Sequence, residues 1–520
     1  MNTRYLAVIL CALLVEAASL GAEPPPVEVR NVRRAFHNGE HNAFTDLAVF
    51  EGALYLTFRS CPDGHGVSPN ASILVVRSTD GVDWRPVHRF QVPQRDTRDP
   101  HFLVFQDRLF VFTGTWYAGD EPVRDSRKLD LNLHLGYAVH TADGQEWSEP
   151  RLLEGTFGHY IWRAASHDGK AYLCGRRKIG FAVGPRGETN EVESLMLESA
   201  DGLSWSRRAT FQEVQGDETA FLFQPDGSLL GIARRGRRKA QLLRSDASWT
   251  NWQRIELDRY LGGPLLARWG DRLVVGGRNN VPGEGPRTSL FWLRDDHLHE
   301  FARLPSGGDN SYPGFIAITP TKALVSWYSC HETVGGDPIT AIYLADLATT
   351  AEREEGVRHA DRLLSRQRSN GGWAKGTDDL SDLDLLLQRH RADTTLDNGT
   401  THGEIRDLAQ AYTTTKLPRF RDGARAGIEF LLASQYENGG WPQRWPQPKG
   451  YARHITFNDH AMVGALEVLR DVARGTEPYA WTDELRQRAQ KAVERGIACI
   501  LACQIKVDGK LTAWGQQHDE

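Results

Sequence analysis

Two aspartates in the C-terminal third of the chain lie in sequences that could carry chemistry. Asp397 belongs to TLDNG and Asp459 to TFNDHAM, and both are predicted at loop–helix junctions, where a carboxylate could face a cleft. The residue type also fits a structural role, because Asp397 could cap a turn before Asn-Gly and Asp459 could cap the following helix. Both interpretations stay open on the residues alone.

Basic and aromatic side chains accompany these aspartates. Lys375 and Arg453 could neutralise acidic groups of a ligand, and Trp441 and Trp445 could stack on its rings. For the lysine and the arginine, a solvated surface charge explains the sequence equally well. His454 fits both a catalytic role and a hydrogen-bonded structural role.

A second group of charged residues recurs at equivalent places of repeated strand pairs in the first two thirds of the chain. Charged groups at the ends of central strands are costly unless they are used or paired. They could therefore form a site, or they could be arginine–carboxylate pairs that close a funnel between the repeats. In chain order the candidates are Arg59, Asp99, Glu218, Arg235 or its neighbour Arg234, Arg278 and Tyr328.

A repeat of short strands must position this second group. From 27 to 346 the strand pairs are LAVF/LYLTFR, HFLVF/LFVFTG, RAASH/AYLCGRR, AFLFQ/LLGIARR, PLLARW/LVVGGRN and FIAIT/ALVSWYS. Turns of the form Asp-Gly-x-x-Trp recur at 78–84, 141–147 and 199–205. In such a turn Asp caps backbone N–H groups, Gly accepts a positive φ and Trp packs beneath. Six copies predict a six-bladed β-propeller, since radial closure leaves few exposed edges.

The pattern changes after a predicted linker at 347–354. Apolar residues now recur three and four positions apart, which predicts helices over 355–367, 403–413, 421–435, 457–473 and 482–505. Two NGGW loops each follow a helix that ends in an LLxxQ-like pattern, so helical hairpins return the chain to a common rim. The predicted fold class is multidomain β + α, a six-bladed β-propeller followed by an incomplete (α/α) toroid over 355–520.

The C-terminal motifs NGGWPQ, HITFNDHAM and KLTAW with QQHD occur in an order that resembles polysaccharide lyase family 10, the pectate lyases with an (α/α) toroid fold. The resemblance implies calcium-assisted β-elimination of polygalacturonate, an acidic plant polysaccharide. It assigns Asp397 and Asp459 to Ca²⁺, a hard cation that takes several oxygen ligands. The other candidates for substrate binding are Lys375, Trp441, Arg453 and His454.

The same resemblance places the proton-abstracting base at an arginine shortly after the QHD motif, beyond residue 520. Arginine is normally protonated, so it acts as a base only in a special, charge-rich site. A full toroid would also need several more helices. We therefore expect the chain to be a fragment that is not an active lyase by itself.

The Asp-Gly-x-x-Trp turns resemble the Asp-boxes of sialidase-like propellers, a signature that propellers of many functions share. The six propeller candidates follow the Arg, Asp, Glu, Arg, Arg, Tyr order of sialidases, although the FRIP-like motif is only FRS here. The alternative function is therefore a sialidase or another glycosidase-type hydrolase acting through the propeller. A third hypothesis is a propeller that binds acidic polysaccharide without cleaving it.

Composition and the chain start limit the partners. A formal net charge of −5 gives no basic excess for nucleic acid. Residues 1–22 have the charge, apolar run and small residues of a secretory signal, which predicts a secreted or periplasmic protein. No later segment is apolar for ~18 residues, so no membrane span is expected. Cys61 and Cys330 follow equivalent strands of the first and last repeats, and a disulfide between them is a hypothesis.

Overall fold

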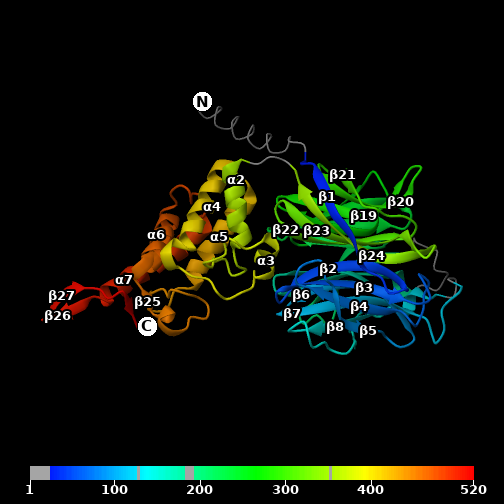
Figure 1. The fold of residues 1–520 in the computed structure, drawn as a ribbon, viewed down its shortest axis with the longest axis horizontal. Coiled ribbons are helices and arrows are strands. Elements are labelled where there is room, and N and C mark those ends of the chain that lie inside the picture. The colour runs from blue at the N-terminus through cyan, green and yellow to red at the C-terminus, as the bar shows by residue number, and fades with distance from the viewer. Residues whose placement is uncertain (1–23, 126–128, 182–191, 351–353, 520) are drawn as a thin grey trace, which may run out of the picture.

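The computed structural model describes residues 24–125, 129–181, 192–350 and 354–519. Figure 1 shows a body of sheets on the right and a body of helices on the left. The predicted signal segment, 1–22, lies outside the described residues, as do 351–353 of the predicted linker. None of the described helices combines the length and the apolar character that a membrane span requires.

The sheets form a six-bladed propeller, as predicted, and each predicted strand pair is the inner pair of one blade. Blade 1 contains β2 (His41–Phe50), β3 (Ala53–Cys61), β4 (Ser72–Ser78) and β5 (Arg85–Phe90). Blade 2 contains β6 (Arg95–Phe105), β7 (Arg108–Tyr117), β8 (Leu135–Thr141) and β9 (Arg151–Leu152). Blade 3 contains β10 (Tyr160–His167), β11 (Lys170–Lys178), β12 (Val192–Ser199) and β13 (Ser206–Gln212).

The remaining three blades repeat the arrangement. Blade 4 contains β14 (Thr219–Phe223), β15 (Leu229–Arg235), β16 (Arg238–Ser245) and β17 (Trp252–Glu256). Blade 5 contains β18 (Gly262–Trp269), β19 (Arg272–Val281), β20 (Gly285–Arg294) and β21 (His297–Arg303). Blade 6 contains β22 (Asn310–Thr319), β23 (Lys322–Val334), β24 (Asp337–Thr349) and β1 (Val27–Phe36). Short 3₁₀ turns, η2 (Leu131–Leu133) and η3 (Ile179–Phe181), lie in the connections.

Strand β1 closes the ring. It pairs antiparallel with β24, from Val27 opposite Thr349 onwards, so the first strand of the propeller completes the last blade. The hypothesis of a disulfide between the first and last blades does not hold, because Cys61 and Cys330 are both free. Backbone pairing between the two ends of the propeller segment closes the ring without a covalent link.

The Asp-Gly-x-x-Trp turns join the third and fourth strands of their blades. In blade 1, the Asp80 carboxylate accepts hydrogen bonds from the backbone N–H of Val82 at 2.8 Å and of Asp83 at 2.9 Å. Gly81 has φ +73°, and its N–H donates to the Ser78 hydroxyl at 2.8 Å. The same bonds recur in blades 2 and 3. These turns are therefore structural, as predicted from their residues.

The inner strand of several blades carries a β-bulge at the same place. Register shifts occur after Ala43, Arg98, Gly262 and Ser311, in blades 1, 2, 5 and 6. In each bulge one residue takes a left-handed φ; these residues are Phe44 (+65°), Asp99 (+53°), Gly263 (+59°) and Tyr312 (+52°). A bulge changes the direction of a side chain, and bulges are common next to binding sites.

The helical body contains five helices that the sequence predicted and one that it missed. They are α2 (Glu355–Arg366), α4 (His402–Thr415), α5 (Pro418–Ala433), α6 (Ala461–Arg474) and α7 (Arg486–Ala502), with the unpredicted short α3 (Asp382–Leu387). Four 3₁₀ turns are η5 (Asp397–Gly399), η6 (Gly450–Arg453), η7 (Asn458–His460) and η8 (Asp483–Leu485). The short strands are β25 (Ile455–Thr456), β26 (Ile505–Val507), β27 (Lys510–Ala513) and β28 (Gln517–His518).

The two NGGW loops are structurally equivalent. Trp373 donates its indole N–H to the Leu363 carbonyl, and Trp441 donates to the Leu431 carbonyl, each at 2.8 Å. Both tryptophans have 0% exposure. The buried rings anchor each loop onto the preceding helix, because an indole N–H placed in a core needs a partner.

The helical body docks on one end of the propeller. Leu383, Leu386 and Leu387 of α3 pack against the largest core cluster of the propeller. Arg419 of α5 pairs with Asp271 in the β18–β19 turn, and Lys322 pairs with Asp382 at 2.8 Å. These propeller residues lie where first strands end and second strands begin. We call this the helix-facing end of the propeller.

Candidate functional sites

Two aspartate-bearing turns meet at the N-terminal ends of neighbouring helices. Turn η5, with Asp397, precedes α4, whereas η7, with Asp459, leads directly into α6, and the two turns contact each other. Left-handed φ values at Asn398 (+53°) and Asp459 (+53°) shape both turns. Helix N-termini carry partial positive charge, which favours carboxylates nearby. The structure therefore places the two predicted calcium ligands in adjoining segments.

The site contains buried oxygen atoms that lack a partner. Oδ1 of Asp397 and Oδ1 of Asn458 are buried without a hydrogen-bond partner among the described residues. The other Asp397 oxygen accepts from the Lys375 ammonium group, and Asp459 accepts from the Asn458 side-chain amide. Unsatisfied buried oxygens are costly, so this oxygen-rich corner suits a cation or a sugar hydroxyl.

The QHD motif reaches the same site. Strand β28 pairs with β25, with Ile455 opposite His518, and the Phe457 N–H donates to the Gln516 carbonyl at 2.9 Å. His454 forms an ion-pair contact with Asp519, with 3.1 Å between Nδ1 and Oδ1. The sequences TLDNG, TFNDHAM and QHD therefore meet around η7.

The other predicted sugar-binding residues have mixed outcomes. Lys375 lies at the site and contacts Asp397. Trp441 is fully buried in the helical core, so it cannot stack on a sugar as predicted. The Arg453 side chain is exposed, and within the described part of the chain it forms no ion pair. Its backbone carbonyl accepts from the Tyr436 hydroxyl at 2.7 Å.

The propeller has a pocket of about 190 Å³ at the end opposite the helix-facing end. First strands begin and second strands end there, and all six blades contribute to the wall. The lining residues are Phe44, His65, Arg98, Asp99, Trp116, Tyr160, Trp162, Arg176, Glu218, Arg234, Arg278 and Tyr312. Four guanidinium groups, two carboxyl groups and several aromatic rings therefore surround one cavity.

Asp99 is a pocket carboxyl group whose acidity is strongly altered. Burial raises its pKa to about 6, although the Arg98 charge and a hydrogen bond from the Tyr160 hydroxyl oppose this rise. The residue is 4% exposed, and its Oδ1 has no partner among the described residues. Asp99 is therefore a buried acid that keeps its proton well above the usual pH range of an aspartate.

Glu218 forms the centre of a second group in the pocket. Its carboxylate accepts from Arg234 Nη1 at 2.8 Å, from the Gly263 N–H at 2.5 Å and from the Tyr312 hydroxyl. Burial and the neighbouring Glu218 raise the pKa of Tyr312. This carboxylate forms an ion pair with Arg234, whereas Asp99 forms no ion pair within the described part of the chain.

Three of the six propeller candidates line the pocket, namely Asp99, Glu218 and Arg278, whereas Arg59, Arg235 and Tyr328 do not. Arg59 is 0% exposed and forms a bidentate pair with Asp96, with both N···O distances 3.0 Å. It also donates hydrogen bonds to the backbone carbonyls of Gly64 and Gly66, on either side of the pocket residue His65.

The predictions of Arg235 and Tyr328 as site residues were wrong, because Arg234 and Tyr312 line the pocket in their place. Arg235 lies next to Arg234 on β15, where alternate side chains face opposite sides, and it pairs with Glu256 at 3.0 Å. The tyrosine beside Glu218 is Tyr312, because the bulge in β22 directs its ring into the pocket. Tyr328 instead donates to Asp309 at 2.9 Å.

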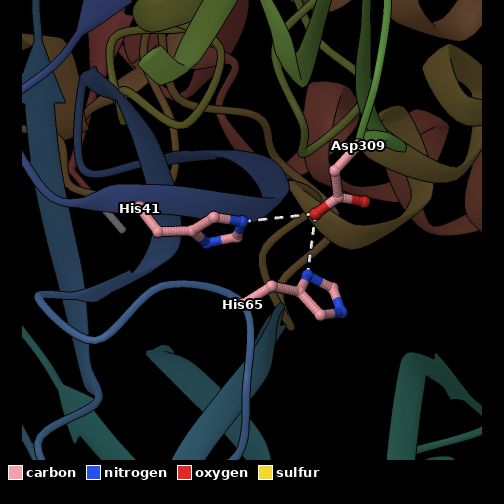
Figure 2. A group of neighbouring side chains, drawn as sticks. All are labelled: His41, His65 and Asp309. Carbon is pink, nitrogen blue, oxygen red and sulfur yellow. Dashed lines mark hydrogen bonds and ion pairs between the residues drawn. The ribbon is translucent and has the colours of Figure 1, made fainter. Parts of the chain in front are cut away.

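A cluster of two histidines and an aspartate borders the pocket. Figure 2 shows His41 and His65 directed at one oxygen of Asp309, at 3.2 and 2.7 Å. Its other oxygen accepts from Arg278 at 3.1 Å and from Tyr328. This donor set could suit a transition metal, but the adjacent guanidinium already balances the carboxylate and repels a second cation. We interpret Asp309 as the residue that holds Arg278 and His65 in position at the pocket.

Comparison with known proteins identifies the helical part. Residues 357–520 match the model of the pectic acid lyase family. The helical part of the chain is therefore similar to pectic acid lyase domains. A mutant family 10 polysaccharide lyase from Cellvibrio cellulosa, solved in complex with trigalacturonic acid, is 35% identical over 32% of this chain, with a TM-score of 0.28. The present chain covers 52% of the length of that lyase.

The propeller also has similar structures. A protein of unknown function from Dyadobacter fermentans is 20% identical over 63% of this chain and 100% of its own, with a TM-score of 0.51. Trypanosoma rangeli sialidase in complex with sialic acid is 13% identical over 66% of this chain and 63% of its own, with a TM-score of 0.44. No curated protein sequence matches the chain.

Proposed function

We propose that the protein is a secreted or periplasmic polysaccharide lyase that cleaves polygalacturonate by calcium-assisted β-elimination in its pectic acid lyase domain. The convergence of Asp397, Asp459 and the QHD strand at the ends of α4 and α6 carries this proposal. These three segments are far apart in sequence, and purely structural roles would not require them to lie next to one another.

The residues at this corner fit Ca²⁺. The carboxylates of Asp397 and Asp459 and the side-chain oxygen of Asn458 are hard oxygen donors, and two of the oxygens in this group are buried without a partner among the described residues. Ca²⁺ takes six to eight such ligands, including water and substrate oxygens. When bound, it would withdraw charge from the sugar carboxylate and acidify the neighbouring C–H proton.

The protein side chains would orient the substrate. Lys375 forms an ion pair with Asp397 in this structure. Once a cation balances the charge of Asp397, the Lys375 ammonium group could pair with a sugar carboxylate instead. His454, held by Asp519, lies one residue before β25 and could donate a hydrogen bond to a sugar hydroxyl. The family resemblance places the arginine that would abstract the proton shortly after the QHD motif.

A binding experiment tests the proposal on the chain itself. Calorimetric titration with Ca²⁺ in the presence of trigalacturonate should show binding that Asp397→Asn or Asp459→Asn weakens at least about tenfold, as loss of a site carboxylate does elsewhere. The matched control is Asp407→Asn, an aspartate of α4 whose side chain is 59% exposed. Equal Ca²⁺ affinity in all four proteins would rule out the assigned site.

Turnover is tested separately. A form of the chain extended beyond residue 520 should release unsaturated products from polygalacturonate, detected by ultraviolet absorbance, and a chelator should abolish the signal. Absence of activity from such a form would contradict the lyase proposal.

The buried carboxyl groups of the propeller favour a second candidate, a glycosidase-type hydrolase. Asp99 retains its proton near pH 6, whereas Glu218 is paired with Arg234, and two carboxyl groups in such different environments suit acid and base roles. Hydrolysis of a fluorogenic glycoside, a sialoside among them, should then be lost in Asp99→Asn and in Tyr312→Phe. No hydrolysis of any tested glycoside by the wild-type chain would eliminate this candidate.

A further inference from the structure

The propeller pocket has the size and walls for one charged six-membered ring. An apolar protein cavity of about 150 Å³ holds a benzene ring, and the pocket measures about 190 Å³. Phe44 and Tyr312 stand edge to face at 4.8 Å, while Trp162 lies nearly parallel to Tyr312 at 6.5 Å. These rings offer flat surfaces to the apolar face of a sugar. The dimensions favour a single sugar residue over a longer stretch of polysaccharide.

Four guanidinium groups are held at the wall by acidic residues. Arg98 is bound by Asp96 at 2.6 Å, Arg176 by Asp217 at 2.8 Å, Arg234 by Glu218 at 2.8 Å and Arg278 by Asp309 at 3.1 Å. Each still has one terminal amino group that donates to no residue in the described part of the chain, Nη1 in Arg98 and Arg278 and Nη2 in Arg176 and Arg234. Preoriented guanidinium donors of this kind bind carboxylates strongly and specifically.

Asp99 supplies an independent indication of a ligand. It is 4% exposed, it forms part of the pocket wall, and its Oδ1 has no partner among the described residues. The left-handed φ values of Asp99, Phe44 and Tyr312 add backbone strain around the same cavity. Such strain persists only where the surroundings enforce it, and it is concentrated at ligand sites. A ligand hydroxyl would satisfy the free oxygen of Asp99.

We propose that the propeller pocket binds the terminal hexuronate residue of an acidic oligosaccharide. A hexuronate combines one six-membered ring, one carboxylate for the guanidinium groups and ring hydroxyls for Asp99 and Glu218. Cleavage of an acidic polysaccharide creates new ends of this kind, so the pocket would take products of the reaction proposed for the lyase domain. The pocket lies at the end of the propeller opposite the helical body, so these products must dissociate before they bind again.

This inference concerns the same pocket as the hydrolase candidate but rests on binding alone. Its test uses the chain with Asp397→Ala and Asp459→Ala in the presence of a chelator, which silences the proposed lyase site. Calorimetric titration with trigalacturonate should show binding, and the neutral galactotriose should bind about 100-fold more weakly, because it lacks the charge-assisted hydrogen bonds.

Neighbouring arginines on β15 provide a matched pair of variants. Arg234→Lys keeps the charge but loses the planar donor geometry, so it should weaken trigalacturonate binding about tenfold. Arg235→Lys, on the opposite face of the strand, should bind within about twofold of the parent. Arg176→Lys is a second pocket variant in case Arg234→Lys unfolds, and circular dichroism reports the folded state of each.

Several results would overturn the inference. One is equal affinity for trigalacturonate and galactotriose. Another is an equal loss of trigalacturonate affinity in Arg234→Lys and Arg235→Lys. A third is tighter binding of a sialylated trisaccharide than of trigalacturonate. Loss of all binding in the parent double variant would assign the oligosaccharide to the helical site instead. Failure of the lyase proposal is a different result, because it removes calcium-dependent binding from the wild-type chain and leaves the pocket unaffected.

Discussion

Replacement of Asp99 by asparagine should stabilise the propeller at neutral pH and have no effect at acidic pH. The folded state raises the pKa of Asp99 from 3.8 to about 6, with burial as the main cause. Because the folded protein holds this proton more tightly than the unfolded chain, the associated stability is fully present below pH 4. It is lost as the pH rises through 6.

The size of the effect follows from the shift. A shift of about two pKa units corresponds to about 3 kcal/mol, at 1.36 kcal/mol for each unit. The asparagine side chain of the Asp99→Asn variant would remain uncharged at every pH and could still accept the hydrogen bond from Tyr160. For a propeller that extends from Val27 to Thr349, about 3 kcal/mol corresponds to a change of about 4 °C in Tm.

Differential scanning calorimetry between pH 4 and pH 8 measures this effect. The Tm difference between Asp99→Asn and wild type should be near zero at pH 4 and about 4 °C in favour of the variant at pH 8. Asp107→Asn is the control, since Asp107 also has a left-handed φ, of +56°, but is exposed in the β6–β7 turn. A Tm that falls equally at both pH values in Asp99→Asn would refute the reasoning.

Three further variants and one control variant test the helical body and its attachment. Gly371→Ala should lower the free energy of unfolding by more than about 2 kcal/mol, because φ is +92° and a Cβ would approach the Ala426 carbonyl to 2.1 Å. Gly399→Ala is the control, since Gly399 has a similar φ of +85° but open space around the added Cβ. Urea unfolding of the two variants therefore separates the cost of the clash from the cost of the backbone conformation. Asp271→Asn removes the ion-pair partner of Arg419 across the interface, so the free energy that holds the helical body against the propeller should fall by about 1–3 kcal/mol. The expected result is faster proteolysis of the connection around residue 350. Trp441→Phe should lower Tm by several degrees through its lost core hydrogen bond, and an unchanged Tm would contradict its burial.

Local sequence patterns were sufficient for the architecture. Apart from β1, the strands of each blade follow one another in the sequence, and each Asp-Gly-x-x-Trp turn is stabilised by bonds between residues two or three positions apart. The five longer helices follow from the spacing of their apolar residues. Helix α3 was missed because it is short and because three of its leucines pack against the distant propeller core. The pairing of β1 with β24 joins segments more than 300 residues apart, which no local pattern reveals.

The motifs also led to much of the proposed lyase site. Asp397 and Asp459 were found from the sequence because each stands in a motif that resembles a known family, and the structure brings their turns into contact. Trp441 was misassigned for a physical reason. The same NGGW sequence fits a sugar platform and a buried anchor, and only the packing of the helix against the loop shows that its indole N–H is used internally.

The propeller pocket marks the boundary between what the sequence determined and what the tertiary structure decided. The sequence specified that charged residues recur at the inner strand ends, and it named Asp99, Glu218 and Arg278. It could not choose Arg234 over Arg235, because adjacent residues on a strand face opposite sides and the facing depends on the register of the blade. Nor could it choose Tyr312 over Tyr328, because a bulge, formed only when β22 pairs with β23, directs Tyr312 into the pocket. Residue types and spacing define a set of candidates, whereas strand register and bulges decide which of them meet.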